Sequence, residues 1–114
     1  MKGVKTMGVF KKKAMISQPM KGRTKERILK DRESAVRFLE NNGYEIIDTV
    51  FDISDSSMDV FGVKVKPIYY LSQAIQEMSK CDLVYFCKGW KDARGCIIES
   101  KIANAYGIKA VYEN

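Results

Sequence analysis

One segment limits what this chain can fold into: residues 81–106, CDLVYFCKGWKDARGCIIESKIANAY. It begins with an apolar, aromatic-rich run at residues 82–86, which is typical of a strand buried on both faces of a parallel sheet. A polar loop with two glycines follows at residues 88–95, and a helical apolar pattern comes next. Because ligands of open α/β sheets bind outside the carboxyl ends of the strands, we expect a site at this loop and the first helical turn. We place Glu99 in that turn.

The rest of the chain alternates strand and helix patterns in the same way. The predicted strands are residues 14–16, 44–51, 82–86 and 108–112, and the predicted helices are residues 25–42, residues 67–78 and a third helix that ends at Gly107. Thr24 is the expected N-cap of the first helix, and Ile98, Ile102 and Ala105 mark the apolar face of the third. Residues 52–66 are too polar for an element and predict a long loop. Arg32 falls inside the apolar face of the first helix, where it either snorkels to the helix edge, which we favour, or turns toward the ligand pocket.

This alternation predicts the α/β class. Repeated right-handed crossovers give a small Rossmann-like or flavodoxin-like three-layer domain with a parallel sheet of about four strands in the order 2-1-3-4. A chain of 114 residues, 46% of them hydrophobic, is long enough for one core and too short for two. We divide it into a basic N-terminal extension at residues 1–12 and one domain at residues 13–114.

Charge and cysteine content exclude several classes of function. The net charge is +6, but lysines gather in the first thirteen residues, and no zinc finger, helix-turn-helix or RNP pattern is present, so we do not expect a nucleic-acid partner. No apolar run is long enough for a membrane span or a signal peptide, which predicts a cytoplasmic protein without a membrane partner. Three cysteines without an export signal predict reduced thiols, with Cys81 and Cys87 as small buried side chains. With no histidine and no CxxC pair, we predict neither a metal nor a cofactor.

Polar and basic residues follow the first strand where it ends. They lie just before a predicted helix N-terminus, whose free amides favour an anion such as a phosphate, or a polar sugar. A solvated turn with ordinary lysines explains the same residues about as well. Neither GxGxxG nor GxxxxGK[ST] is present, so a dinucleotide fold or a P-loop hydrolase is not indicated. The candidate substrate-binding residues here are Ser17, Gln18, Pro19, Met20, Lys21, Gly22 and Arg23.

A second set of candidates surrounds Glu99. A carboxylate at this place can attack or stabilise an anomeric carbon, as in glycosyl transfer through a covalent sugar ester, although helix starts also prefer acidic residues for dipole reasons alone. Trp90 either offers a flat face to a base or folds onto the core. Gly95 lets a ligand approach the backbone. The other candidates are Asp92, Arg94 and, in the second predicted strand, Asp48.

The motifs ISQPMKGRT and CDLVYFCKGWKDARGCIIESKIANAYGI resemble the small phage and bacterial proteins of the nucleoside 2-deoxyribosyltransferase-like superfamily, which also contains the deoxynucleoside 5'-monophosphate N-hydrolases. The resemblance covers residues 13–113. It implies that Glu99, in the step Gly-x-x-x-Glu that starts at Gly95, is the nucleophile that takes the deoxyribosyl group from the base. It also implies that residues 17–23 hold the sugar or its 5'-phosphate and that the protein is a homo-oligomer, a dimer or higher. Asp92 is our candidate for a residue that assists Glu99.

The chain departs from the pattern of these enzymes at two positions. Their acidic residue in the helix before the central strand corresponds to Ala74, and their Asp or Ser six residues before the nucleophile corresponds to Ala93, with Asp92 one residue away. Two functions therefore stay open. The first is cleavage or transfer at the N-glycosidic bond of a deoxynucleoside or its 5'-monophosphate through a glutamate nucleophile. The alternative is a non-catalytic module that senses or sequesters a nucleotide-derived ligand.

Overall fold

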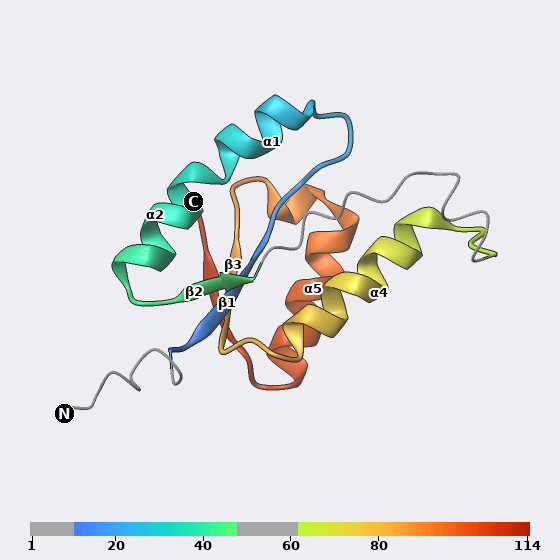
Figure 1. Ribbon diagram of the computed structural model, residues 1–114. Helices are drawn as coiled ribbons and strands as arrows, with labels where there is room; N and C mark the ends of the chain where they lie inside the picture. Colours follow the sequence, from blue (N-terminus) through green and yellow to red (C-terminus); the bar gives the residue numbers. More distant parts are fainter. Residues whose placement is uncertain (1–10, 48–61) are drawn as a thin grey trace.

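The computed structural model describes residues 11–47 and 62–114, and these residues form one sheet with helices around it. Four strands lie parallel in the order β2-β1-β3-β4 (Figure 1), which confirms the predicted fold class and strand order. The strands are β1 (Lys13–Ser17), β2 (Glu45–Ile47), β3 (Leu83–Phe86) and β4 (Lys109–Tyr112). The helices are α1 (Lys25–Asp31), α2 (Glu33–Asn41), α4 (Lys66–Met78), the short 3-10 helix η2 (Trp90–Asp92) and α5 (Arg94–Ala105).

The register of the sheet brings the carboxyl ends of β1 and β3 together. Ser17, the last residue of β1, pairs with Phe86, the last residue of β3, and Phe86 in turn pairs with Tyr112 of β4. The chain passes from β1 to β2 on one side and from β3 to β4 on the other. This arrangement makes the ends of β1 and β3 the topological switch point, where open α/β sheets bind their ligands. We call the segments that follow the two strands the β1 loop (residues 18–24) and the β3 loop (residues 87–93).

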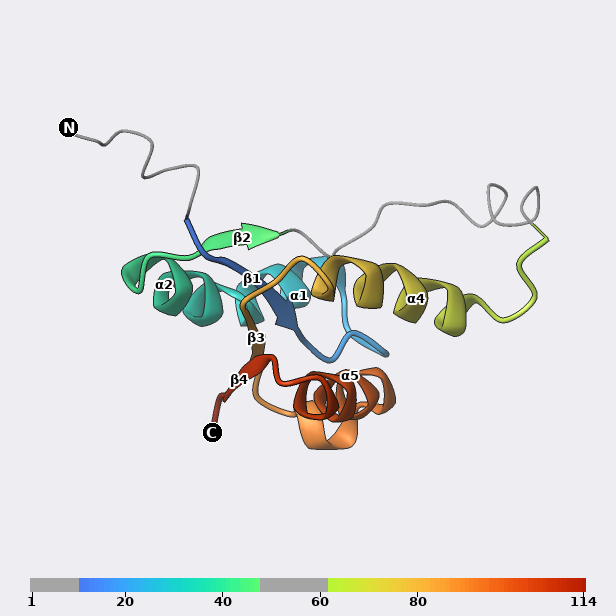
Figure 2. The ribbon, with the colours of Figure 1, turned by 90° about the horizontal axis from the view of Figure 1, so that it is seen from below.

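Helices cover both faces of the sheet, because alternate residues of each buried strand point to opposite faces. On one face Ile16 and Leu83 pack with Leu39 of α2. On the other face Met15 and Phe86 belong to the cluster formed with α4 and α5. Figure 1 shows α1 and α2 on one side of the strands and α4 and α5 on the other, and Figure 2 shows α5 beside β4. The predicted three layers are therefore present.

The first predicted helix, residues 25–42, is in fact two helices. The break falls at Arg32, whose ψ is −4° and which ends α1 and begins α2. Backbone bonds from Arg32 to Ile28 and from Val36 to Arg32 continue across it, so the apolar periodicity that predicted one helix survives the bend. Arg32 does not snorkel to the helix edge as we favoured. Its guanidinium donates to Gln18 Oε1 at 3.4 Å, which ties the break to the β1 loop.

The start and the buried face of α5 also differ from the prediction. The helix begins at Arg94, so Glu99 lies in its second turn and not in its first, and Gly95 lies inside the helix rather than in the loop. Ala105, assigned to the apolar face, is exposed. The buried residues of α5 are instead Cys96, Glu99, Ser100 and Ala103. Ile102, also assigned to the apolar face, does pack against the core, but the buried face includes two polar residues that bond to the sheet, Glu99 to Ser17 and Ser100 to Tyr112.

Several other predictions concern the chain outside the described residues. Outside them lie residues 1–10 of the N-terminal extension, residues 48–51 of the predicted second strand, including Asp48, and residues 52–61 of the predicted long loop.

The three cysteines are free thiols, as predicted, and Cys87 is buried while Cys81 is only partly buried. Among the described helices, none has the length and apolar character that crossing a bilayer requires.

Candidate functional site

A buried hydrogen bond lies at the switch point. Ser17 Oγ donates to Glu99 Oε1 at 2.5 Å, between residues 82 positions apart in the sequence. Only 2% of Ser17 and 8% of Glu99 is exposed. No basic side chain of the described residues forms an ion pair with Glu99, although burial of an unpaired charge costs free energy. A carboxyl group in this position is the strongest candidate for chemistry in the described part of the chain.

Burial also changes the ionisation of Glu99. Loss of solvation raises the pKa of its carboxyl group above the ordinary value of 4.5, and the hydrogen bond from Ser17 lowers that pKa in part. The carboxylate form is therefore poorly solvated when it exists. A poorly solvated carboxylate can act as a nucleophile, and its protonated form can donate a proton as a general acid.

Replacing Glu99 with glutamine should stabilise the fold most at alkaline pH. Since the folded pKa of Glu99 is raised above its unfolded value, the stability that this residue contributes is fully present below the unfolded pKa and is lost as the pH rises through the folded pKa. An amide has no such loss and still accepts the bond from Ser17. Urea unfolding at an acidic and at a mildly alkaline pH measures the effect, with the exposed Glu40→Gln as control. An equal gain from Glu99→Gln at both pH values would contradict the raised pKa.

The β1 loop and the β3 loop touch beside this pair. The β1 loop turns back at Gly22, whose φ is 76°, and Arg23 N donates to Met20 O at 3.0 Å, as in a type II turn. The turn brings Arg23 to the β3 loop. A Cβ atom placed on Gly89 would lie 3.4 Å from Arg23 Nη2 and 3.5 Å from Pro19 Cγ. Gly89 has a φ of 90°, so a larger residue there would strain the backbone where the loops meet.

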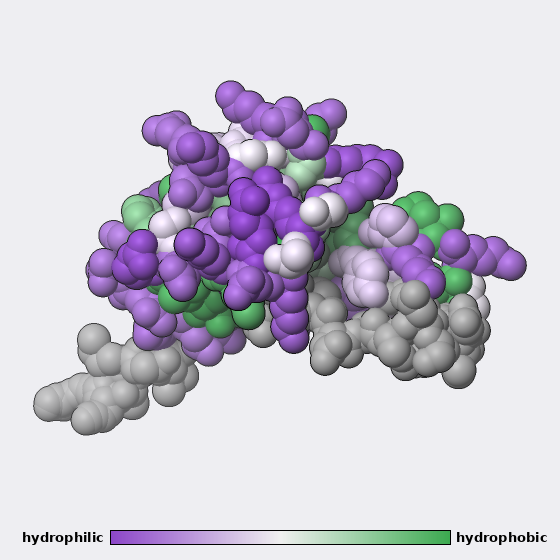
Figure 3. All heavy atoms as spheres, turned by 90° about the horizontal axis from the view of Figure 1, so that it is seen from above, coloured by the Kyte–Doolittle hydropathy of each residue, from purple (hydrophilic) through white to green (hydrophobic). Residues whose placement is uncertain are grey.

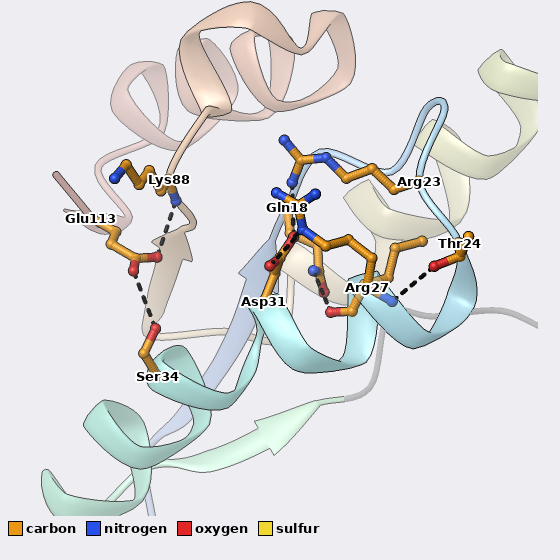
Figure 4. Close-up of polar contacts among 9 residues, drawn as sticks. Gln18, Arg23, Thr24, Arg27, Asp31, Ser34, Lys88 and Glu113 are labelled. Atoms are coloured by element: carbon orange, nitrogen blue, oxygen red, sulfur yellow. Dashed lines mark hydrogen bonds and ion pairs between the residues drawn. The ribbon is translucent and has the colours of Figure 1, made fainter.

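Positive charge exceeds negative charge at this contact. Arg23 Nη1 lies 3.1 Å from Asp31 Oδ2, and Arg27 Nε donates to both oxygens of the same carboxylate at 3.0 and 2.9 Å (Figure 4). Two guanidinium groups thus share one carboxylate. Because Arg27 already satisfies Asp31, Arg23 can turn to an anionic ligand at little cost, and 26% of its side chain is exposed.

Gln18 was predicted to bind substrate, and the structure shows both ends of its side chain occupied. Its Nε2 donates to Ile28 O at 2.9 Å, and its Oε1 accepts from Arg32. The residue is buried. These contacts fix the β1 loop against α1 and α2, so Gln18 supports the loop from its buried side.

The remaining predicted residues are spread over the β1 loop, the β3 loop and the start of α5. Trp90 packs on the core, with its ring centroid 5.7 Å from that of Phe86 and 4.7 Å from that of Tyr112. Asp92 is exposed, and with Trp90 it lines an open depression of about 580 Å³ whose walls include neither Ser17 nor Glu99. Pro19 is buried beside Gly89. The other exposed residues of the predicted set are Met20, Lys21, Gly22, Arg94 and Gly95.

Cys96 is a residue of the site that the sequence did not reveal. It is buried three residues before Glu99 on α5 and lies beside Ser17. Burial is the largest cause that raises its pKa to about 11, so the thiol is protonated at neutral pH and acts as a packing group. Asp31 and Arg32 were also missed as residues that hold the β1 loop. The sequence did contain a signal for the role of Arg32, since a charged residue inside an apolar helix face must find a polar partner.

The described residues hold no cluster of three or more His, Cys, Asp or Glu side chains that could bind a metal ion.

Comparison with known proteins gives a family model, described as "Domain of unknown function (DUF4406)", which matches residues 12–112. The match spans almost all of the domain predicted at residues 13–114. No curated protein and no solved structure is significantly similar to the chain.

Proposed function

The chain belongs to the DUF4406 family, whose description names no activity, and we propose its function from its own residues. We propose cleavage or transfer at the N-glycosidic bond of a deoxynucleoside or deoxynucleoside 5'-monophosphate, with Glu99 as the nucleophile. The observation that carries the proposal is the buried Ser17–Glu99 bond at the switch point of the sheet. The resemblance to the nucleoside 2-deoxyribosyltransferase-like superfamily supplies the reaction class.

In the proposed reaction Ser17 holds Oε1 of Glu99, and the carboxylate attacks C1' of the sugar. The bond between C1' and the base nitrogen breaks, its electron pair leaves with the base, and a proton must reach that base. Water or a second base then displaces the sugar from Glu99. That Asp92 assists this transfer stays a prediction. Its exposed carboxylate lies in the depression beside Trp90, and Glu99 is not among the residues that line this depression.

A 5'-phosphate is the substrate group that suits the β1 loop. Arg23 faces Gly89 where the two loops meet, and it shares Asp31 with Arg27. Thr24 caps α1, since its Oγ1 accepts from Arg27 N at 3.1 Å, as predicted for this residue. One of the amides at the start of α1 is therefore already satisfied. The proposal for phosphate rests on the charge of Arg23, with the exposed Lys21 as a second cation.

Incubation with a panel of deoxynucleosides and their 5'-monophosphates tests the proposal. We expect free base from at least one monophosphate, detected by chromatography. Arg23→Ala should lower kcat/KM for that monophosphate about tenfold or more, the effect of losing a hydrogen bond to a charged group, and change it little for the matching nucleoside. Lys30→Ala, an exposed change on the same helix α1, is the control. Equal losses for the nucleoside and the monophosphate would contradict the role of Arg23 in binding phosphate.

A specific observation favours the alternative, a non-catalytic module that senses or sequesters a nucleotide-derived ligand. Ala74, at the position where the enzymes carry an acidic residue, is 7% exposed and packs with Met15 and Met78 in the core. Ala93 packs against the same cluster. Neither position offers a carboxylate. Binding of a nucleotide without release of base from any member of the panel would decide for this alternative.

A homo-oligomer is part of the same proposal. Val65 and Ile68, at the start of α4, are 53% and 62% exposed. Figure 3 shows hydrophobic surface gathered over this end of α4, on the right. Exposed apolar surface of this kind supports contact with a second subunit.

A further inference from the structure

The carboxylate of Glu113 joins three separate parts of the fold. Its Oε1 accepts from the backbone N–H of Lys88 at 3.0 Å, and its Oε2 accepts from Ser34 Oγ at 3.1 Å (Figure 4). Its own backbone N–H donates to Phe86 O at 2.8 Å, which continues the pairing of β4 with β3. Glu113 therefore holds the end of β4, the β3 loop and α2 at fixed positions.

The β3 loop has few other long-range hydrogen bonds. At its first residue, Cys87 N donates to Ser17 O at 2.9 Å. Beyond that residue the backbone bonds of the loop are local, from Trp90 to Cys87, from Asp92 to Gly89 and from Ala93 to Trp90. Among the described residues, the bond from Lys88 to Glu113 is the one hydrogen bond that ties residues 88–93 to a distant element. It lies one residue before Gly89, where the loop meets Pro19 and Arg23.

We propose that Glu113 is a positioning residue for the site: its carboxylate sets the place of the β3 loop against the β1 loop, and so the place of Arg23 beside a bound ligand. The second half of this inference rests on the proposed function, because it assigns the ligand to the contact between the loops. The first half concerns the loop alone. The two halves can therefore be tested apart.

Hydrogen exchange of two neighbouring amides tests the first half without any ligand. Glu113→Ala should accelerate exchange of the Lys88 amide about tenfold or more, because a bond to a charged acceptor is lost. The Cys87 amide, which donates to Ser17 O, should keep its rate and serves as the internal control. Trp90 is the only tryptophan of the chain, so its emission reports the same loop, and collisional quenching of it should increase.

Two further variants separate positioning from general destabilisation. Glu113→Gln keeps a carbonyl acceptor for the Lys88 amide and should accelerate its exchange less than Glu113→Ala does. If the alanine variant does not fold, the exchange rate of the Lys88 amide in Glu113→Gln still tests the proposal. Ser34→Ala removes the bond from α2 to Glu113 but keeps the acceptor of the Lys88 amide, so it should leave that amide better protected than Glu113→Ala does. An unchanged exchange rate at Lys88 in both Glu113 variants would overturn the proposal.

The ligand arm uses deoxynucleoside 5'-monophosphates as probes. If the loop sets the place of Arg23, Glu113→Ala should raise KM or Kd for the monophosphate more than it lowers kcat, and Glu113→Gln should restore most of the affinity. Faster Lys88 exchange with unaltered affinity would overturn the second half and keep the first. Absence of both binding and base release in the wild type, with the same faster exchange, would be a failure of the proposed function alone.

Discussion

Glu99→Gln should abolish base release and leave ligand affinity within a few fold. A carboxylate that forms a sugar ester cannot be replaced by its amide, so we expect the rate to fall by about a thousandfold or more. The amide keeps the shape of the side chain and still accepts the bond that Ser17 donates to Oε1. Single-turnover assays with chromatography measure the chemical step, and calorimetry measures the affinity.

The same variant separates the two open functions. In a non-catalytic module the wild type releases no base, and Glu99→Gln changes only the affinity, by about 1 to 3 kcal/mol if the carboxylate accepts a ligand hydroxyl. Glu40→Gln, at an exposed position of α2, is the matched control and should alter neither rate nor affinity. Turnover at the wild-type rate by Glu99→Gln would show that Glu99 is not the nucleophile.

Phe86→Ala should give the largest loss of stability, about 3 to 5 kcal/mol. Phe86 is the last residue of β3 and is fully buried. Its ring stacks on Tyr112, with centroids 5.0 Å apart and an interplanar angle of 16°, and it also contacts Trp90. Truncation would leave a cavity between the sheet and the β3 loop, because the surrounding side chains close it only in part. Urea unfolding followed by circular dichroism measures the free energy of unfolding.

An exposed tyrosine provides the control for this loss of stability. Tyr106, at the end of α5, is 81% exposed, and Tyr106→Ala should change stability by no more than about 0.5 kcal/mol. Trp90 emission should shift to the red in Phe86→Ala, since its packing partner is gone. A loss for Phe86→Ala no greater than that for Tyr106→Ala would show that the aromatic cluster does not stabilise the domain.

The sequence by itself determined the sheet and its order. Continuous apolar runs such as residues 83–86 belong to strands that are buried on both faces, and the alternation with helical patterns permits few other topologies. Local signals also held where one residue decides the structure, as with Thr24 at the N-cap of α1. The positions of Ser17 and Glu99 on the elements that meet at the switch point followed from this topology, because parallel strands end at one edge of the sheet.

Only the tertiary structure decided which polar side chains meet. The Ser17–Glu99 hydrogen bond depends on how α5 is rotated against the sheet, and apolar periodicity alone does not show that the buried face of α5 carries Glu99 and Ser100. Gln18 turned inward to Ile28 and Arg32, while Trp90 packed on Phe86 and also lines the depression beside Asp92. A buried polar group is stable only with a partner, and these partners come from distant parts of the chain. Their pairing is a property of the packed fold, which no local pattern of residues contains.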